Sequence, residues 1–572
     1  MRSMLFPEES DGYYQKTLNK KITKLKLLDE LLNYEQLRAV NTVLNETYGP
    51  LPYIISGPPG TGKTKTIVEM ALQLVTERER TQLLVCAPSE PAADTLVQRL
   101  SKHLKPSQLL RLNSPSRSFP ETPNNVLPFC CIDNGMFSLP SFEQLMRLKI
   151  VVSTCCDAEI LLRARISNRD LCNLEQRLFA AIHPEASQSQ AQLHWTGLLM
   201  DEAAQATEVE ALIPLSVVAP PSDCNLPDER LPIFVMAGDQ HQLGPRTASK
   251  APAVQTSLFE RLLERPFYRD HPLARSKQTG GVMRPLTQEM LPILRPAFTS
   301  LIRNYRSHPA ILATPSRLFY NDTLEPEATG TDALQSWTGW EGRQWPVLFS
   351  HNAAPDEIEQ DGGGWYNLAE AKMACDYAFS FLQASLLLPL EICIMSPFRA
   401  QVRILRKIAR EPPYSMSGVN IGPLEAFQGL ESRLVILCTT RTRDRFIDQD
   451  VAKGLGVIHE PKRFNVALTR AKEGLIVIGN PEVLVKDENW RAFLSFCGRN
   501  ELCDGLESLS LESDAEDKML VSRLERQLLH EMNGVDGLTN GTRQFGIDDG
   551  DDAEIWRSGV AAEEALIESE EG

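Results

Sequence analysis

The sequence lacks any long apolar run. No stretch reaches the roughly 18 apolar residues that a membrane-spanning helix needs, and residues 1–7 have no apolar signal-peptide core. We therefore expect a cytoplasmic protein, with the nucleus as the alternative, and no membrane association. The 12 cysteines form no C-x-x-C pair and no Cys/His zinc spacing. That pattern favours reduced thiols over a disulfide framework or a zinc centre.

Charge of one sign is concentrated at one end of the chain. The formal net charge is −16 at pH 7, and residues 501–572 alone contain 20 acidic and 5 basic side chains. The rest of the chain is therefore nearly neutral and can still carry a basic groove, so the overall acidity does not exclude nucleic acid. The tail is also poor in aromatic residues, which predicts disorder, with one amphipathic helix near 518–532.

A phosphate-binding loop stands near the start of the chain. It fits G-x-x-x-x-G-K-[ST] and lies between a predicted strand at 53–56 and a predicted helix at 65–76. Glycines let backbone N–H groups approach phosphate oxygens, and the helix N-terminus adds a favourable dipole. Lys63 is predicted to reach the outer phosphates, and the Thr64 hydroxyl to hold Mg²⁺. The loop residues are Gly57, Pro58, Pro59, Gly60, Thr61, Gly62, Lys63 and Thr64.

Gln36 has two interpretations. A side-chain amide just upstream of a phosphate loop offers a donor and an acceptor, and can therefore read the edge of adenine. However, Asn33 stands three residues before Gln36, and this spacing resembles a capping box for a helix over 35–45. The residues alone leave both interpretations open.

Two carboxylates follow a predicted buried strand at 198–200. A strand-terminal Asp201 in a phosphate-loop protein suits Mg²⁺, and Glu202 can polarise the attacking water. A further predicted strand at 233–237 runs into a polar loop in which Gln242 is a candidate sensor of the γ-phosphate. Lys63, Asp201, Glu202 and Gln242 are therefore the catalytic candidates in this half of the chain.

Predicted strands alternate with predicted helices in two series, which indicates an α/β fold with two lobes. Enrichment in proline and charge at 264–300 marks the predicted hinge, and the arm at the start of the chain is basic and helical by its pattern. The expected regions are an arm at 1–31, a first lobe at 32–265 with an irregular insertion at about 101–148, a second lobe at 275–500 and the tail at 501–572.

Further motifs in the sequence resemble those of a known protein family. They occur at 201–205, 238–245, 303–309, 365–367, 425–431 and 461–472, in addition to the phosphate loop. This series resembles that of the superfamily 1 helicases, in the branch of the nonsense-mediated-decay helicase, and is most similar to the Armitage-type RNA helicases of RNA silencing. The resemblance covers roughly residues 30–495. It implies two tandem RecA-like lobes with parallel sheets, and ATP with Mg²⁺ in the cleft between them.

The resemblance also implies roles for residues of the second lobe. Arg306 and Arg470 would meet the γ-phosphate when the cleft closes, because a guanidinium stays charged and forks onto phosphate oxygens. Tyr305 would stack on the adenine that Gln36 reads, with a core position as the equal alternative. Glu431 would contact the ribose or, alternatively, cap a helix.

Closure of the cleft would shift one contact with a single strand relative to another. Strand-end hydroxyls and loop N–H groups suit phosphates, and an exposed aromatic ring suits base stacking. For Phe398 a place in the core is the stronger interpretation. The implied nucleic-acid contacts are Pro88, Ser89 and Thr154 in the first lobe, and Pro397, Phe398, Arg399 and Gln428 in the second.

The chain departs from the family pattern in two ways. Glu90 stands where the family usually has Asn, and a carboxylate there would repel a phosphate backbone unless it points away. Only about 30 residues precede the adenine motif, whereas family members usually carry a β-barrel there that helps to hold RNA. We therefore expect a short paralogue or an incomplete gene model, and the departures leave the grip on RNA, the processivity and the RNA preference open.

These observations predict an ATP-dependent RNA helicase or translocase that moves 5′→3′ on single-stranded RNA, in RNA silencing or RNA decay. A DNA helicase of the same branch is the nearest alternative. The other alternative is an RNA clamp switched by ATP, whose acidic tail recruits silencing or decay proteins.

Overall fold

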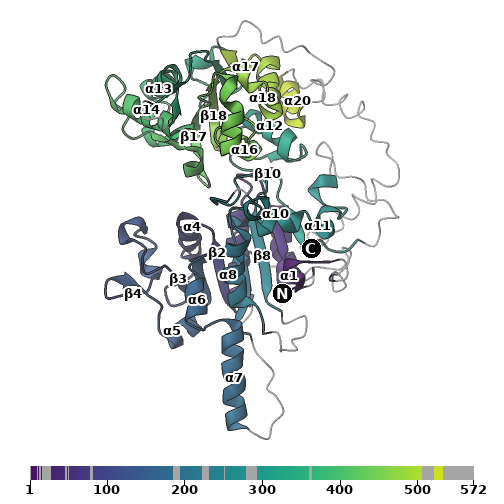
Figure 1. Ribbon diagram of the computed structural model, residues 1–572. Helices are drawn as coiled ribbons and strands as arrows, with labels where there is room; N and C mark the ends of the chain where they lie inside the picture. Colours follow the sequence, from purple (N-terminus) through teal and green to yellow (C-terminus); the bar gives the residue numbers. More distant parts are fainter. Residues whose placement is uncertain are drawn as a thin grey trace.

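The computed structural model shows two α/β lobes, one above the other in Figure 1. Most of the predicted basic arm and most of the acidic tail lie outside the residues that it describes. Within the described residues, no helix is long and apolar enough to cross a membrane. The structure describes residues 2–8, 11, 15, 27–45, 48, 50–77, 81–183, 193–221, 231–249, 251–277, 293–359, 364–504 and 521–532.

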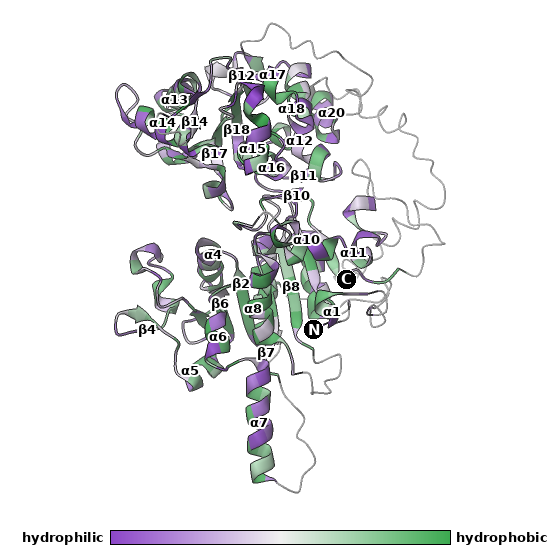
Figure 2. Cartoon of the chain, viewed as in Figure 1, coloured by the Kyte–Doolittle hydropathy of each residue, from purple (hydrophilic) through white to green (hydrophobic). Residues whose placement is uncertain are grey.

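The first lobe is built on a seven-stranded parallel sheet in the order β3-β6-β2-β7-β8-β1-β9. Strands β1, β2, β6 and β8 are buried along their whole length, as expected for continuous apolar runs in a parallel sheet. Figure 2 accordingly colours β7 and β8 largely as hydrophobic. The bounds are β1 (Tyr53–Ser56), β2 (Gln82–Ala87), β3 (Leu109–Arg111), β6 (Ile150–Thr154), β7 (Trp195–Met200), β8 (Ile233–Gly238) and β9 (Phe298–Ser300).

The second lobe is built on a six-stranded parallel sheet in the order β16-β15-β17-β18-β12-β19. Side chains alternate between its two faces, because successive residues of a strand point in opposite directions. Leu475 and Val477 of β18 belong to one core cluster, and Ile476 and Ile478 to the other. The bounds are β12 (Val347–His351), β15 (Ile392–Ser396), β16 (Asn420–Pro423), β17 (Ser432–Cys438), β18 (Ala471–Gly479) and β19 (Cys503–Asp504).

Helices pack against both sheets. In the first lobe the helices are α1 (Arg2–Leu5), α2 (Tyr34–Leu44), α3 (Lys63–Glu77), α4 (Glu90–Leu100), α5 (Phe142–Arg147), α6 (Glu159–Arg163), α7 (Asn168–Ile182), α8 (Glu208–Val218), α9 (Pro252–Gln255), α10 (Leu258–Leu263) and α11 (Pro266–Arg269). In the second they are α12 (Pro309–Phe319), α13 (Leu368–Gln383), α14 (Arg399–Arg410), α15 (Ile447–Lys453), α16 (Pro461–Leu468), α17 (Pro481–Leu484), α18 (Glu488–Arg499) and α20 (Arg523–Met532).

Among the described residues, three two-stranded pairs lie outside the main sheets. The β4–β5 and β13–β14 pairs are antiparallel, and the β10–β11 pair is parallel. Their strands are β4 (Ile132–Asp133), β5 (Met136–Phe137), β10 (Arg303–Asn304), β11 (Glu325–Pro326), β13 (Glu357–Ile358) and β14 (Trp365–Tyr366).

The structure corrects two predicted boundaries. The segment at 101–148 is not a pure insertion, because β3 within it pairs with β6 as the edge strand of the first sheet. The predicted hinge at 264–300 contains β9, which pairs with β1. The first lobe therefore extends past residue 265 to Ser300, and the second lobe begins after it rather than at 275. Both strands are only three residues long, too short to give a periodic apolar signal.

The predicted tail helix is present as α20 and belongs to the second lobe. Leu524 and Leu528 are buried in its core cluster. The backbone N–H of Arg523 donates to the Asp322 carboxylate at 2.5 Å, and Glu525 forms an ion pair with Arg499 at 2.9 Å. This part of the acidic region is therefore held against α12 and α18.

We expect Leu524→Ala to lower the free energy of unfolding of the second lobe by about 2–5 kcal/mol, since the change leaves a cavity in a closed core. Chemical denaturation followed by circular dichroism measures the effect. Gln527→Ala on the exposed side of the same helix is the matched control. Equal stability of the two variants would show that α20 does not pack on the lobe.

Candidate ATP site between the two lobes

The phosphate loop connects β1 to α3 and closes around the Lys63 ammonium. Lys63 Nζ donates to the Gly57 carbonyl at 2.8 Å and lies 3.5 Å from the Pro58 carbonyl. Gly60 and Gly62 have φ angles of +74° and +84°, a region that favours glycine. The loop therefore has the left-handed turns that direct backbone N–H groups at an anion.

The groups expected to hold Mg²⁺ lie together at the carboxyl end of the sheet. Asp201 follows β7, and its carboxylate is hydrogen-bonded by Thr64. Burial and the charge of Glu202 raise the pKa of Asp201 to about 6, while Thr64 and Lys63 act in the opposite direction. A hydroxyl and a carboxylate are oxygen ligands of the kind that Mg²⁺ prefers, with phosphates and water completing its shell. The residues present therefore fit this ion.

Glu202 stands beside this pair in a strained conformation. Its φ and ψ are +51° and +34°, a left-handed backbone that costs a non-glycine residue roughly 1–3 kcal/mol and is common at functional sites. Its carboxylate accepts a hydrogen bond from Gln205 Nε2 at 2.9 Å. The turn thus holds a half-buried carboxylate next to Asp201.

The second lobe contacts the phosphate loop directly. Asn304 Nδ2 donates to the Pro59 carbonyl at 2.7 Å, and the Tyr305 backbone N–H donates to the Gly60 carbonyl at 2.9 Å. A Cβ atom on Gly60 would lie only 2.6 Å from Arg306 Cβ. Glycine is therefore needed here for the close approach of the two lobes as well as for the turn.

The two predicted arginine fingers lie close together on this interface. Arg470 Nη2 donates to Gln242 Oε1 of the first lobe at 2.7 Å. Arg306 forms an ion pair with Glu431, with Nε at 2.7 Å from Oε2. Burial, and then the charge of Arg306, lower the pKa of Arg470 to about 9. An anion placed between the guanidinium groups would offset both effects, because it stabilises their charged forms.

A hydrogen-bond network joins the lobes next to Gln242. Asp239 Oδ2 accepts from Gln242 Nε2 at 2.9 Å and from the Tyr320 hydroxyl at 2.8 Å. Asn465 Nδ2 donates to the Tyr320 oxygen at 2.7 Å and to the His241 carbonyl at 2.8 Å. The sequence prediction missed Tyr320, which stands at the end of α12 in a stretch without a motif signal. It also missed Asn304 and Asn465, although both stand inside motifs.

The structure brings the predicted adenine-binding residues together. Asn33 and Gln36 form the capping box of α2, so that prediction is confirmed, and Gln36 Nε2 also donates to the Thr61 carbonyl at 2.9 Å. Asn33 Nδ2 donates to the Tyr305 hydroxyl at 3.0 Å. The Tyr305 side chain is not in the core, because the residue is 45% exposed. Recognition of adenine by Gln36 and Tyr305 stays a prediction.

Glu431 caps no described helix. It instead pairs with two cations, Arg306 and Lys472, the latter at 2.5 Å. Burial alone would raise the pKa of Glu431, but the two cations outweigh it and the pKa is lowered. A contact of Glu431 with ribose would therefore have to compete with these ion pairs.

The predicted nucleic-acid contacts of the first lobe lie at the ends of adjacent strands. Pro88 and Ser89 follow β2, and Thr154 ends β6, which pairs with β2. The Glu90 carboxylate is bound by Arg111 and, at 3.0 Å, by Arg117. Its charge is thus offset within the protein. This is the local reason why an acidic residue is tolerated beside a predicted phosphate contact.

The predicted nucleic-acid contacts of the second lobe differ in their burial and in the surface that they face. Phe398 is only 4% exposed, with its ring 5.1 Å from the Arg441 guanidinium carbon. It therefore takes the core position that the sequence favoured, and the alternative prediction that a base stacks on Phe398 is wrong. Pro397 is half-buried and Arg399 exposed at the start of α14. Gln428 faces the first lobe, where its Nε2 donates to the Leu243 carbonyl at 3.3 Å.

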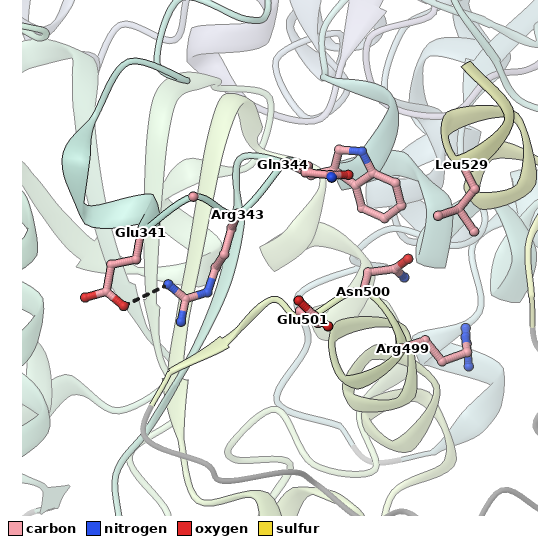
Figure 3. Close-up of a pocket in the computed structure, with 9 residues that line it drawn as sticks. Glu341, Arg343, Gln344, Arg499, Asn500, Glu501 and Leu529 are labelled. Carbon is pink, nitrogen blue, oxygen red and sulfur yellow. Dashed lines mark hydrogen bonds and ion pairs between the residues drawn. The ribbon is translucent and has the colours of Figure 1, made fainter. Parts of the chain in front are cut away.

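A polar cavity of about 490 Å³ lies away from these residues, between α18, α20 and the loop before β12. Figure 3 shows Arg343 and Glu341 paired on one side and Arg499, Asn500 and Leu529 on the other. Because Glu341 and Glu525 offset the two arginines, the cavity carries little excess charge to bind a nucleotide.

Comparison with known proteins agrees with the motif series. Two family models, each described as an AAA domain, match residues 31–136 and 283–482. Human RNA helicase Mov10l1 is 33% identical over 502 residues, which cover 86% of this chain and 37% of the relative. The putative helicase MOV-10 of Gallus gallus is 32% identical over 521 residues (86% and 49%). The probable RNA helicase armi of Drosophila melanogaster is 29% identical over 519 residues (87% and 41%).

Over most of its length the chain is similar to the Armitage-like superfamily 1 helicases. It spans less than half the length of each of these relatives. Among solved structures, the arterivirus helicase nonstructural protein 10 gives a TM-score of 0.33 at 12% identity, covering 78% of this chain and 62% of that chain. That likeness is too low to carry an argument.

If Arg470 is an arginine finger, Arg470→Gln should reduce ATP turnover by about 10³–10⁵-fold. Nucleotide binding should change little, since the phosphate loop is untouched. Arg410→Gln, at an exposed arginine on α14, is the matched control. A phosphate-release assay and equilibrium binding of a fluorescent ATP analogue measure the two effects. Turnover within tenfold of the unmodified chain would remove Arg470 from the site.

Proposed function

We propose that the chain is an ATP-dependent RNA helicase or translocase that hydrolyses ATP between its lobes and moves 5′→3′ on single-stranded RNA. The observation that carries this proposal is the buried contact of Arg470, in the second lobe, with Gln242, in the first. It supports a composite site, because the γ-phosphate sensor of one lobe already lies against the arginine of the other. The proposal includes a cytoplasmic location and a role in RNA silencing or decay.

The residues of the site divide the chemistry between them. Lys63 would leave the loop carbonyls and bind the outer phosphates, and Glu202 would accept a proton from the attacking water. Thr64 and Asp201 would hold Mg²⁺, which supplies neutralisation of phosphate charge. Arg306 and Arg470 would exchange Glu431 and Gln242 for γ-phosphate oxygens.

That exchange supports coupling between hydrolysis and movement. The same interface carries Asn304 on the phosphate loop and Gln428 on Leu243, so a change at the γ-phosphate alters contacts that set the relative position of the lobes. Each lobe would hold a different part of the strand, and closure would move one contact relative to the other. The acidic tail is proposed to recruit partner proteins.

We prefer RNA to DNA as the substrate because relatives carry the names RNA helicase Mov10l1 and probable RNA helicase armi. The motifs are of a kind that binds sugar and phosphate, and no residue in them is assigned to a 2′-hydroxyl. A DNA helicase of the same branch therefore remains the second candidate, and an ATP-switched clamp the third.

The test is ATP turnover and strand separation by the full chain. We expect single-stranded RNA to stimulate turnover more than DNA of the same sequence, and a duplex with a 5′ single-stranded tail to be unwound in preference to one with a 3′ tail. Lys63→Ala should abolish both activities. Nucleotide-dependent RNA binding without unwinding would favour the clamp, and an absence of RNA stimulation would contradict the motor.

A further inference from the structure

We propose that Trp365 and Phe446 form a base-stacking platform for a single strand on the second lobe, with Arg445 placed to bind a neighbouring phosphate, whereas Arg443 is already held by Asp356. The inference rests on the proposed function and extends it to a specific binding surface. It gives a role to the 365–367 stretch, for which the ATP site has no use, and it replaces the buried Phe398 as the stacking group.

The two rings form a pair at the surface. Their centroids are 4.4 Å apart with an interplanar angle of 43°, and both residues are half-buried. Trp365 also faces Ile358 across the β13–β14 pair, and Ile358 is 51% exposed. Residues opposite each other on paired strands share a face, so the three side chains make one apolar patch.

The buried side chain of Arg441 packs against the inner side of this patch. The Arg441 guanidinium carbon lies 4.1 Å from the Trp365 ring centroid and 5.1 Å from that of Phe398. Arg441 is only 2% exposed, and its charge is offset by Asp356 and Asp450, at 2.8 and 2.7 Å. The Arg441 guanidinium therefore lies between the buried Phe398 ring and the half-buried Trp365 ring. Of these two rings, Trp365 is the one that a base can reach.

Further guanidinium groups surround the rings of this patch. The guanidinium carbons of Arg443 and Arg445 lie 5.2 and 4.6 Å from the Phe446 centroid. Among the described residues, Arg445 is exposed and has no ion-pair partner. The acid next to it, Asp444, is already paired with Lys486. Aromatic faces edged by arginine are the arrangement by which proteins bind single strands without reading sequence.

The platform lies at the end of the second sheet where nucleic-acid contact is predicted. Arg441 and Phe446 follow β17, and Pro397 follows its neighbour β15. A Cβ atom on Gly364 would lie 2.9 Å from Ala400 Cβ, so the hairpin bearing Trp365 packs on the first turn of α14. In the view of Figure 1, α14 of the upper lobe and α4 of the lower lobe, which follows Ser89, both lie at the left.

The decisive experiment compares strands with and without bases. We would measure binding of a fluorescent 20-nucleotide RNA, and of an abasic strand of equal length, by anisotropy with a non-hydrolysable ATP analogue. Trp365→Leu and Phe446→Leu should each weaken binding of the RNA about tenfold, since stacking contributes roughly 1–3 kcal/mol per base. Neither should change binding of the abasic strand, and Trp365→Phe should restore most of the affinity.

Phe142→Leu is the matched control, because Phe142 is 53% exposed on the first lobe. Equal losses for RNA and the abasic strand would show that Trp365 only supports the fold, and would overturn the proposal. Unchanged RNA binding would overturn it too, and would leave the patch to a protein partner. Failure of the unmodified chain to bind RNA at all would instead contradict the proposed function.

Arg445→Gln tests the phosphate contact separately. The slope of log K against log salt should become shallower by about 0.7, which is the contribution of one phosphate contact in a single strand. The same decrease is expected for the RNA and for the abasic strand, because both carry phosphates. An unchanged slope would remove Arg445 from the surface.

Discussion

The phosphate loop is held by both lobes, and the rest of the structure depends on this contact. Asn304 and the backbone of Tyr305 donate to carbonyls at Pro59 and Gly60, which leaves the loop N–H groups for phosphates. The same short segment continues into Arg306. The end of β10 therefore sets both the shape of the phosphate loop and the position of the predicted arginine finger Arg306. As a result, the two lobes share a single site.

Each cationic side chain of this site is hydrogen-bonded to an oxygen atom of the protein. Lys63 binds the Gly57 carbonyl, Arg470 binds Gln242, and Arg306 binds Glu431. These partners stabilise charges that are costly to bury alone, and they are the contacts that phosphate oxygens would replace. In the proposed mechanism, the energy released by this exchange moves one lobe against the other and so couples hydrolysis to a shift along a strand.

The sequence predicted the parts of this arrangement that produce long or periodic signals. Buried strands such as β1 and β7 are apolar runs, and the phosphate loop and Asp201 stand at their ends, so their places follow from local pattern. The three-residue strands β3 and β9 give no such pattern. Tyr320 gains its role only from partners far away in the chain, and Arg441 lies between the rings of Trp365 and Phe398 because distant segments meet there. Those features arise from tertiary packing, which local spacing does not report.

The most direct test of the shared site is a crystal structure of the full chain with Mg²⁺ and an ADP–fluoroaluminate mimic of the transition state. We predict guanidinium nitrogens of Arg306 and Arg470 about 2.7–2.9 Å from the fluoride ligands, with Thr64 and Asp201 at the metal. Arg470 still on Gln242 and Arg306 still on Glu431, with the mimic bound by the first lobe alone, would contradict the account.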